Sequence, residues 1–211
     1  VQYLQDNPKF FEDHAEVVSR MLIPHPHGGR TISITERQML SLREKNKQLE
    51  VKMNELLQFG EENDTISEKM HRLSVAMIAA GSFQSVLHTL NFHLRDDFAI
   101  PHVALRLWLR PEKVEELPAF AEVGAELQSF AATLSQPYCG STSGFETSSW
   151  FADASRHVRS QALIAMRNGG GTIGMIALGS EEAQRFYAGM GTLYLERLGE
   201  MASAALARVL R

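Results

Sequence analysis

A heptad repeat in the first half of the chain constrains the fold more than any other feature. Its members recur at steps of three or four residues: Met39, Leu42, Asn46, Leu49, Met53, Leu56, Phe59, Asn63, Ile66, Met70, Leu73 and Met77. Charged residues fill the other faces. The pattern predicts one long helix over residues 35–80, about 68 Å in length at about 1.5 Å per residue. A compact domain of this size cannot bury so long an apolar edge alone.

We therefore predict a homodimer through a coiled coil. The predicted dimer seam consists of Met39, Leu42, Asn46, Leu49, Met53, Leu56, Asn63, Ile66 and Met70. Asn46 and Asn63 occupy core positions, where paired asparagines weaken packing but fix the register of a parallel dimer. Two successive steps of three residues around Leu56, beside Gly60, form a stammer, at which a change of register costs little free energy. The alternative is a single helix packed on its own domain, with both asparagines solvated.

The residues before the long helix predict a short helical segment, residues 1–34. Asn7 and Pro8 are typical of a helix start, and apolar residues then recur at helical spacing, so we expect a helix over residues 8–22. Two prolines and two glycines within residues 24–29 end it. The pair Thr35 and Gln38 matches the capping box that begins a helix.

The remaining residues, 81–211, predict a mixed domain. A helical stripe runs from Phe83 to about Asp97, after an interruption at residues 81–82. Strand-like alternation follows over residues 103–110, and two more strands, 161–167 and 172–179, flank a glycine-rich turn. Apolar residues from 195 to 209 predict a final helix. The fold class is therefore α+β, with N-terminal helices and a long coiled-coil helix before an antiparallel sheet flanked by helices.

Charge and cysteine content exclude several classes of partner. The formal net charge is −4, from 21 Lys and Arg against 25 Asp and Glu. This balance does not attract nucleic acid or anionic lipid, and no apolar run approaches the roughly 18–20 residues of a membrane span. A single cysteine, Cys139, allows no intrachain disulfide and fits a cytoplasmic protein. The histidines lack metal-ligand spacing, so no metal site is predicted.

Several segments resemble known families. Gly174–Ser180, Phe186 and the closing helix are similar to the last strand and helix of GAF domains, which are small-molecule sensing and regulatory modules. The chain more narrowly resembles the domain of unknown function 484 family of bacterial proteins. The resembling segments are residues 7–14 with Pro24-His25, residues 36–38 with Leu42-Arg43, Cys139-Gly140, and residues 185–195. The GAF resemblance implies a ligand pocket on one sheet face, and helices on the other face that commonly form a dimer interface.

Five residues are candidates for a ligand pocket: Arg106, Trp108, Tyr138, Cys139 and Trp150. The first two share one face of a predicted strand, where a guanidinium and an indole could recognise an anionic or aromatic metabolite. The others belong to a Ser-, Thr- and Gly-rich loop, residues 138–151, predicted to cover the pocket. The alternative is an arginine salt bridge beside a core tryptophan. The G-x-G-x-x-G spacing of residues 169–174 precedes a strand, which favours a hairpin turn over a dinucleotide site.

Two hypotheses of function follow. The first is a noncatalytic sensory or regulatory module for signalling, in which small-molecule binding to a GAF-like domain is coupled to a coiled-coil dimer. The second is a ligand-free dimeric scaffold that presents its N-terminal helices to a protein partner. No catalytic residues are predicted. Nucleophilic catalysis would require Cys139 or a serine to meet a base, such as His102 or His157 for Cys139, and no sequence spacing indicates such a meeting. The ligand and any cofactor are unknown from the sequence. The sequence motifs of the GAF subtypes that bind cyclic nucleotides or bilins do not occur in this chain.

Overall fold

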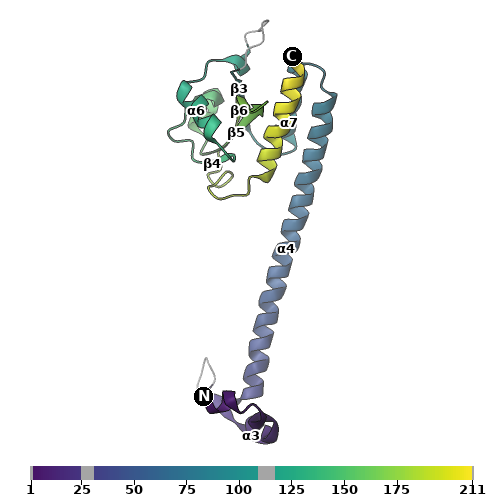
Figure 1. Cartoon of the computed structure of the whole chain (residues 1–211), viewed down its shortest axis with the longest axis vertical. Helices are drawn as coiled ribbons and strands as arrows, with labels where there is room; N and C mark the ends of the chain where they lie inside the picture. The colour runs from purple at the N-terminus through teal and green to yellow at the C-terminus, as the bar shows by residue number, and fades with distance from the viewer. Residues whose placement is uncertain (1, 25–30, 109–116, 211) are drawn as a thin grey trace. The chain divides into compact units, whose positions relative to one another are not determined.

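The computed structural model describes residues 2–24, 31–108 and 117–210 and divides into two units, Val1–Asn63 and Asp64–Arg211 (Figure 1). The division falls within one continuous helix, α4 (Ile34–Ala79). The predicted domain boundaries lie at the ends of this helix instead. Most of the turn predicted at 24–29, and the end of the strand predicted at 103–110, lie outside the described residues.

The first unit opens with three short helices and a two-stranded sheet. The elements are α1 (Gln2–Asp6), α2 (Lys9–Asp13), α3 (Ala15–Arg20), β1 (Leu22–Pro24) and β2 (Thr31–Ser33), with the two strands antiparallel. The single helix predicted over residues 8–22 is wrong, because His14 leaves the helical region with φ −122° and ψ 35°. Neither α1 nor α2 buries a residue, so no packed face holds a longer helix together.

The predicted long helix is confirmed as α4, which has 46 residues. It begins at Ile34, so Thr35 lies inside the first turn and not at the capping position that its sequence pattern predicts. Its buried residues are Met70, Leu73 and Met77, all in the second unit. The same helix therefore contributes to a core only over its C-terminal part.

The second unit contains a four-stranded antiparallel sheet in the order β3-β6-β5-β4. Its strands are β3 (His102–Leu107), β4 (Tyr138–Gly140), β5 (Ser160–Asn168) and β6 (Gly171–Ser180). The predicted hairpin is confirmed as β5 and β6, and its turn places Gly169 and Gly170 at positive φ, which glycine adopts without strain. The α+β class is confirmed.

Helices and 3₁₀ segments cover both faces of this sheet. They are α5 (Phe83–Asp96), η1 (Pro118–Phe120), α6 (Ala125–Thr133), η2 (Glu146–Arg156) and α7 (Leu193–Val209). The predicted helices α5 and α7 are confirmed, and Ser82 caps α5 through a reciprocal capping box with Ser85. The sequence pattern did not predict η1, α6, β4 or η2, which all lie in the long stretch between β3 and β5.

Each sheet face has its own apolar core, and Figure 1 shows α6 and α7 on opposite sides of the sheet. We call the side packed against α5, α7 and the end of α4 the helix face. Its core includes Leu73, Leu90, Leu107, Ile164, Ile176 and Leu206. We call the side packed against α6 and η2 the cover face. Its core includes Ala104, Leu127, Ala131, Phe151, Leu163, Met175 and Ala177.

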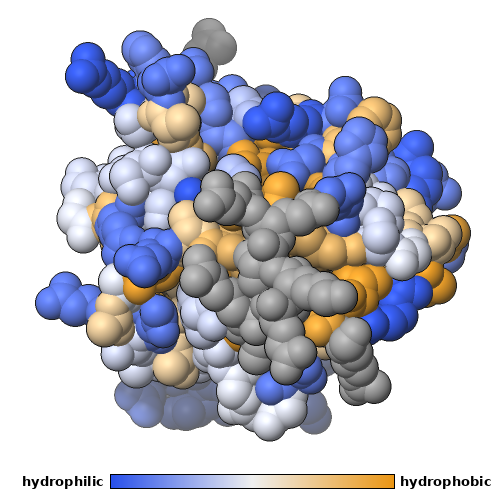
Figure 2. All heavy atoms as spheres, turned by 90° about the horizontal axis from the view of Figure 1, so that it is seen from above, coloured by the Kyte–Doolittle hydropathy of each residue, from blue (hydrophilic) through white to orange (hydrophobic). Residues whose placement is uncertain are grey.

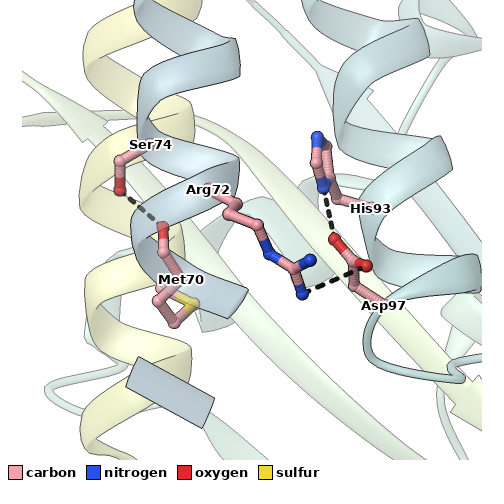
Figure 3. Close-up of polar contacts among 5 residues, drawn as sticks. All are labelled: Met70, Arg72, Ser74, His93 and Asp97. Atoms are coloured by element: carbon pink, nitrogen blue, oxygen red, sulfur yellow. Dashed lines mark hydrogen bonds and ion pairs between the residues drawn. The ribbon is translucent and has the colours of Figure 1, made fainter. Parts of the chain in front are cut away.

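Polar contacts fix the C-terminal part of α4 within the second unit. Arg208 of α7 donates from Nη1 to the carbonyl of Ile78 at 2.7 Å and from Nη2 to that of Met77 at 3.1 Å. These carbonyls lack partners inside the helix, so the guanidinium acts as a helix C-cap. On the other side, Arg72 of α4 approaches Asp97, which also binds His93 (Figure 3).

The surface is polar overall but carries exposed apolar groups. In the space-filling view, hydrophilic residues surround a group of hydrophobic residues toward the middle of the visible face (Figure 2). Every helix among the described residues is too short or too polar to span a membrane.

Candidate functional site

Two of the predicted pocket residues meet on the cover face. Arg106 lies on β3, and its guanidinium carbon is 5.1 Å from the ring centroid of Trp150 on η2. Strand alternation explains this placement, because Ala104 and Arg106 of β3, and Trp108 directly after it, share the side that faces η2 and α6. The guanidinium also donates from Nη1 to the carbonyl of Leu105 at 3.0 Å. The strand and η2 thus hold a cation against an aromatic ring.

Arg106 is half-buried and has no ion pair within the part of the chain that the structure describes. Burial lowers the pKa of its guanidinium, and the charge of Glu146 partly opposes this effect. The Glu146 carboxylate itself accepts a hydrogen bond from the backbone N–H of Gly124 at 3.1 Å. Arg106 therefore keeps donors available in a partly desolvated position.

Trp108 and Tyr138 lie on the same face but are already engaged. The Trp108 indole N–H donates to the carbonyl of Thr172 at 2.7 Å. The Tyr138 hydroxyl donates to the carbonyl of Ser141 at 3.3 Å, and its ring centroid lies 4.9 Å from that of Phe145. Both side chains contribute apolar surface more than free hydrogen-bonding groups.

Cys139 does not join these residues. It lies between Tyr138 and Gly140 on β4, and its side chain belongs to the core of the helix face. Burial raises the pKa of its thiol to about 11, so the thiol is protonated near neutral pH. His102 lies on β3 at the opposite edge of the sheet, so the pairing of Cys139 with His102 that a nucleophile would need is not formed. The placement of Cys139 in the pocket is therefore corrected.

The structure adds polar residues that the sequence analysis did not select. Thr147 of η2 donates its hydroxyl to the side-chain oxygen of Gln161 at 2.7 Å, and both side chains are fully buried. His102, at the start of β3, has a buried Nε2 without a hydrogen bond among the described residues. Gln161 could have been noticed as a polar residue within the otherwise apolar run of β5, whereas Thr147 carried no signal.

A cavity of about 340 Å³ opens beside Trp108. Its lining includes Leu107, Trp108, Phe120, Glu122, Val123 and Gln128. The amide of Gln128 donates to the carbonyl of Val123 at 3.0 Å, which fixes one wall. No group of three or more metal-ligating side chains occurs among the residues that the structure describes.

The predicted dimer seam divides into two parts. Leu42, Leu49, Met53 and Leu56 are all more than 60% exposed, and Met39 and Asn46 are exposed as well. Asn63 is exposed, Ile66 is partly buried against the helix-face core, and Met70 belongs to that core with 8% exposure. Met70 is therefore unavailable to a partner chain, because its own domain already buries it.

A family model described as "Protein of unknown function, DUF484" matches residues 1–210. The chain belongs to the DUF484 family. This DUF484 chain is 27% identical over 215 aligned residues to an uncharacterized protein YigA of Salmonella typhimurium, covering 99% of this chain and 89% of that relative. YigA of Escherichia coli K12 is 26% identical with the same coverage. The resemblance of the whole chain to this family is confirmed, and neither relative has a described role.

Proposed function

We propose that this DUF484 protein is a noncatalytic regulatory module that binds a small anionic molecule on the cover face and dimerises through α4. The observation that carries the ligand proposal is Arg106, a half-buried cation without an ion pair in the described chain. A partly desolvated guanidinium gains more from an anion than an exposed one does, because water competes less for its donors.

The surroundings of Arg106 favour a planar anion. Its forked donors match a carboxylate or phosphate, and the ring of Trp150 supports the guanidinium from one side. The cavity beside Trp108, two residues along the chain from Arg106, offers room for the body of such a ligand. The GAF resemblance of the C-terminal segment supports the same sheet face as a ligand site.

The dimer proposal rests on the exposed part of the seam. Leu49, Met53 and Leu56 are 66%, 62% and 69% exposed, and together they form an apolar stripe at heptad spacing. A second copy of α4 would bury this stripe in a coiled coil. Because α4 also supplies Leu73 and Met77 to the helix-face core, a change in the sheet would reach the coiled coil through one helix.

The ligand proposal is tested by thermal unfolding in the presence of nucleotides, amino acids and aromatic or aliphatic carboxylates. A ligand at about 100 times its Kd stabilises the native state by about 2.7 kcal/mol, which raises the Tm. We expect Arg106→Gln to abolish this increase. Arg95→Gln, an exposed arginine on α5, is the matched control and should keep it. An equal increase in both variants would refute the role of Arg106.

The ligand-free scaffold remains a second candidate because the cover face is densely packed. Phe151, Leu127 and Ala131 are buried there between the sheet, η2 and α6. A scaffold predicts a stable dimer by light scattering and no change in Tm with any compound tested. Stabilisation that depends on Arg106 would exclude it.

A further inference from the structure

The segment that covers this sheet face contains a strained residue. Ala152, in the middle of η2, has φ 49° and ψ −125°. An alanine at positive φ costs of the order of 1–3 kcal/mol, and such strain persists only where surrounding contacts impose it. Its neighbour Phe151 is 8% exposed and packs on the sheet, so the strain accompanies the insertion of that ring.

Phe151 lies over a row of residues that crosses all four strands. Gly140, Gln161, Gly179 and His102 are in register from β4 through β5 and β6 to β3. A Cβ at Gly179 would lie 2.9 Å from Cζ of Phe151, so the glycine provides the space that the ring fills. The ring thus occupies a position between two polar side chains.

Those two side chains are unusual for a sheet core. Gln161 is fully buried; its side-chain oxygen accepts a hydrogen bond from Thr147 of η2 at 2.7 Å, and its amide nitrogen donates a long one to the carbonyl of Ser141 at 3.4 Å. The Nε2 of His102 is buried and makes no hydrogen bond among the described residues; it contacts the exposed carboxylate of Glu181 only as an ion pair at 3.6 Å. A buried ring nitrogen that makes no hydrogen bond is costly, and a bound polar group would satisfy it.

We propose that η2 is a displaceable cover and that the Phe151 ring occupies the position of a planar aromatic ligand whose hydrogen-bonding edge meets Gln161 and His102. This inference rests on the proposed function, since it assigns a second subsite to the same sheet face. Opening separates Thr147 from Gln161 and Trp150 from Arg106. The segment η2 therefore borders both the anion site at Arg106 and this subsite.

Thiol labelling tests the opening. In a Cys139→Ser background, a cysteine is introduced by Ala177→Cys under the cover or by Ala162→Cys on the helix face, both at fully buried positions. If η2 opens locally, a water-soluble disulfide reagent modifies the first at least about tenfold faster than the second, because local opening is more frequent than global unfolding. Adding Ala152→Gly relieves the strain of the closed form and should slow labelling at position 177 by about fivefold or more. Equal rates at positions 177 and 162 would overturn the proposal.

Ligand binding provides an independent measurement. In Phe151→Ala, we expect benzamide, a planar ring with a hydrogen-bonding edge, to raise the Tm more than toluene does. His102→Leu in the same background should remove that difference. If Phe151→Ala does not fold, the same Tm measurement is made on Phe151→Leu. If neither variant folds, the ratio of labelling rates at positions 177 and 162 decides whether η2 opens. Tm increases that depend on Arg106, together with equal labelling rates, would retain the proposed function and reject the displaceable cover. Faster labelling at position 177 without any Arg106-dependent increase in Tm would retain the cover and reject the proposed anion site.

Discussion

The two parts of α4 carry the same heptad pattern but meet different surroundings. Leu49 and Met53, in the first unit, are 66% and 62% exposed, whereas Leu73 and Met77, in the second, are 0% and 2% exposed. The later residues pack against the sheet, α5 and α7 of their own chain. A heptad therefore predicts that an apolar edge will be buried, and it does not specify whether the partner is another chain or the rest of the same one.

The first prediction concerns the buried part of α4. Leu73→Ala should lower the free energy of unfolding by about 2–5 kcal/mol, because it removes apolar contact and leaves a cavity. Leu49→Ala should leave the unfolding of the second unit almost unchanged. Urea denaturation at two protein concentrations measures both. A concentration-dependent loss for Leu73→Ala would mean that this residue also serves an interface between chains.

The second prediction concerns the exposed part. Met53→Glu should weaken dimerisation at least about tenfold, or about 1.4 kcal/mol, because it places like charges face to face in the seam. Val51→Glu is the matched control, since Val51 is also exposed and apolar but lies off the heptad. Sedimentation equilibrium measures both constants. A wild-type chain that stays monomeric at micromolar concentration would contradict the seam itself.

The sequence predicted the regular elements well because their periodicity is a local property. α4, α5, the β5–β6 hairpin and α7 all follow from spacing alone. The elements that were missed in the second unit are short or irregular, and tertiary contacts stabilise them more than propensity does; they are η1, α6, β4 and η2. β4 has three residues and is held by its pairing with β5.

The candidate site was predictable only in part. Alternation along this strand correctly placed Arg106 and Trp108 on one face, opposite the face that packs against α4, α5 and α7. The same reasoning could not place Cys139, because β4 was read as a loop and a loop has no alternating faces. The contact of Arg106 with Trp150 joins residues 44 positions apart, which no local pattern reports.

The third prediction tests how α4 is anchored by polar contacts in the second unit (Figure 3). The pKa of Asp97 is lowered chiefly by its 2.6 Å hydrogen bond from His93, with burial opposing and the charge of Arg72 assisting. The folded pKa of Asp97 lies below that of an unfolded aspartate, which is about 3.9. The stabilisation from the ionised Asp97 is therefore complete above the unfolded pKa and is lost as the pH falls through the folded pKa. Asp97→Asn should therefore lower the Tm at pH 7. The fall in Tm between pH 5 and pH 3 should be smaller in this variant than in the wild type.

The neighbouring Asp96 provides the control for this measurement. It is exposed at the end of α5, so Asp96→Asn should leave the acid limb of the Tm profile close to that of the wild type. An Asp97→Asn profile parallel to the wild-type one would show that the contact with His93 and Arg72 contributes nothing to the anchoring of α4.

The smallest expected effect contrasts two helical glycines. A Cβ at Gly60 of α4 would meet no atom within 4 Å, so Gly60→Ala should raise helix stability by about 0.5–1 kcal/mol through lower backbone entropy in the unfolded chain. At Gly199 of α7, a Cβ would lie 2.6 Å from Cγ2 of Ile164, so Gly199→Ala should destabilise the second unit. Opposite signs in thermal denaturation would confirm that α4 at Gly60 is free of close packing. Destabilisation by Gly60→Ala would instead locate a close partner at the stammer, where the seam of a second chain would pass.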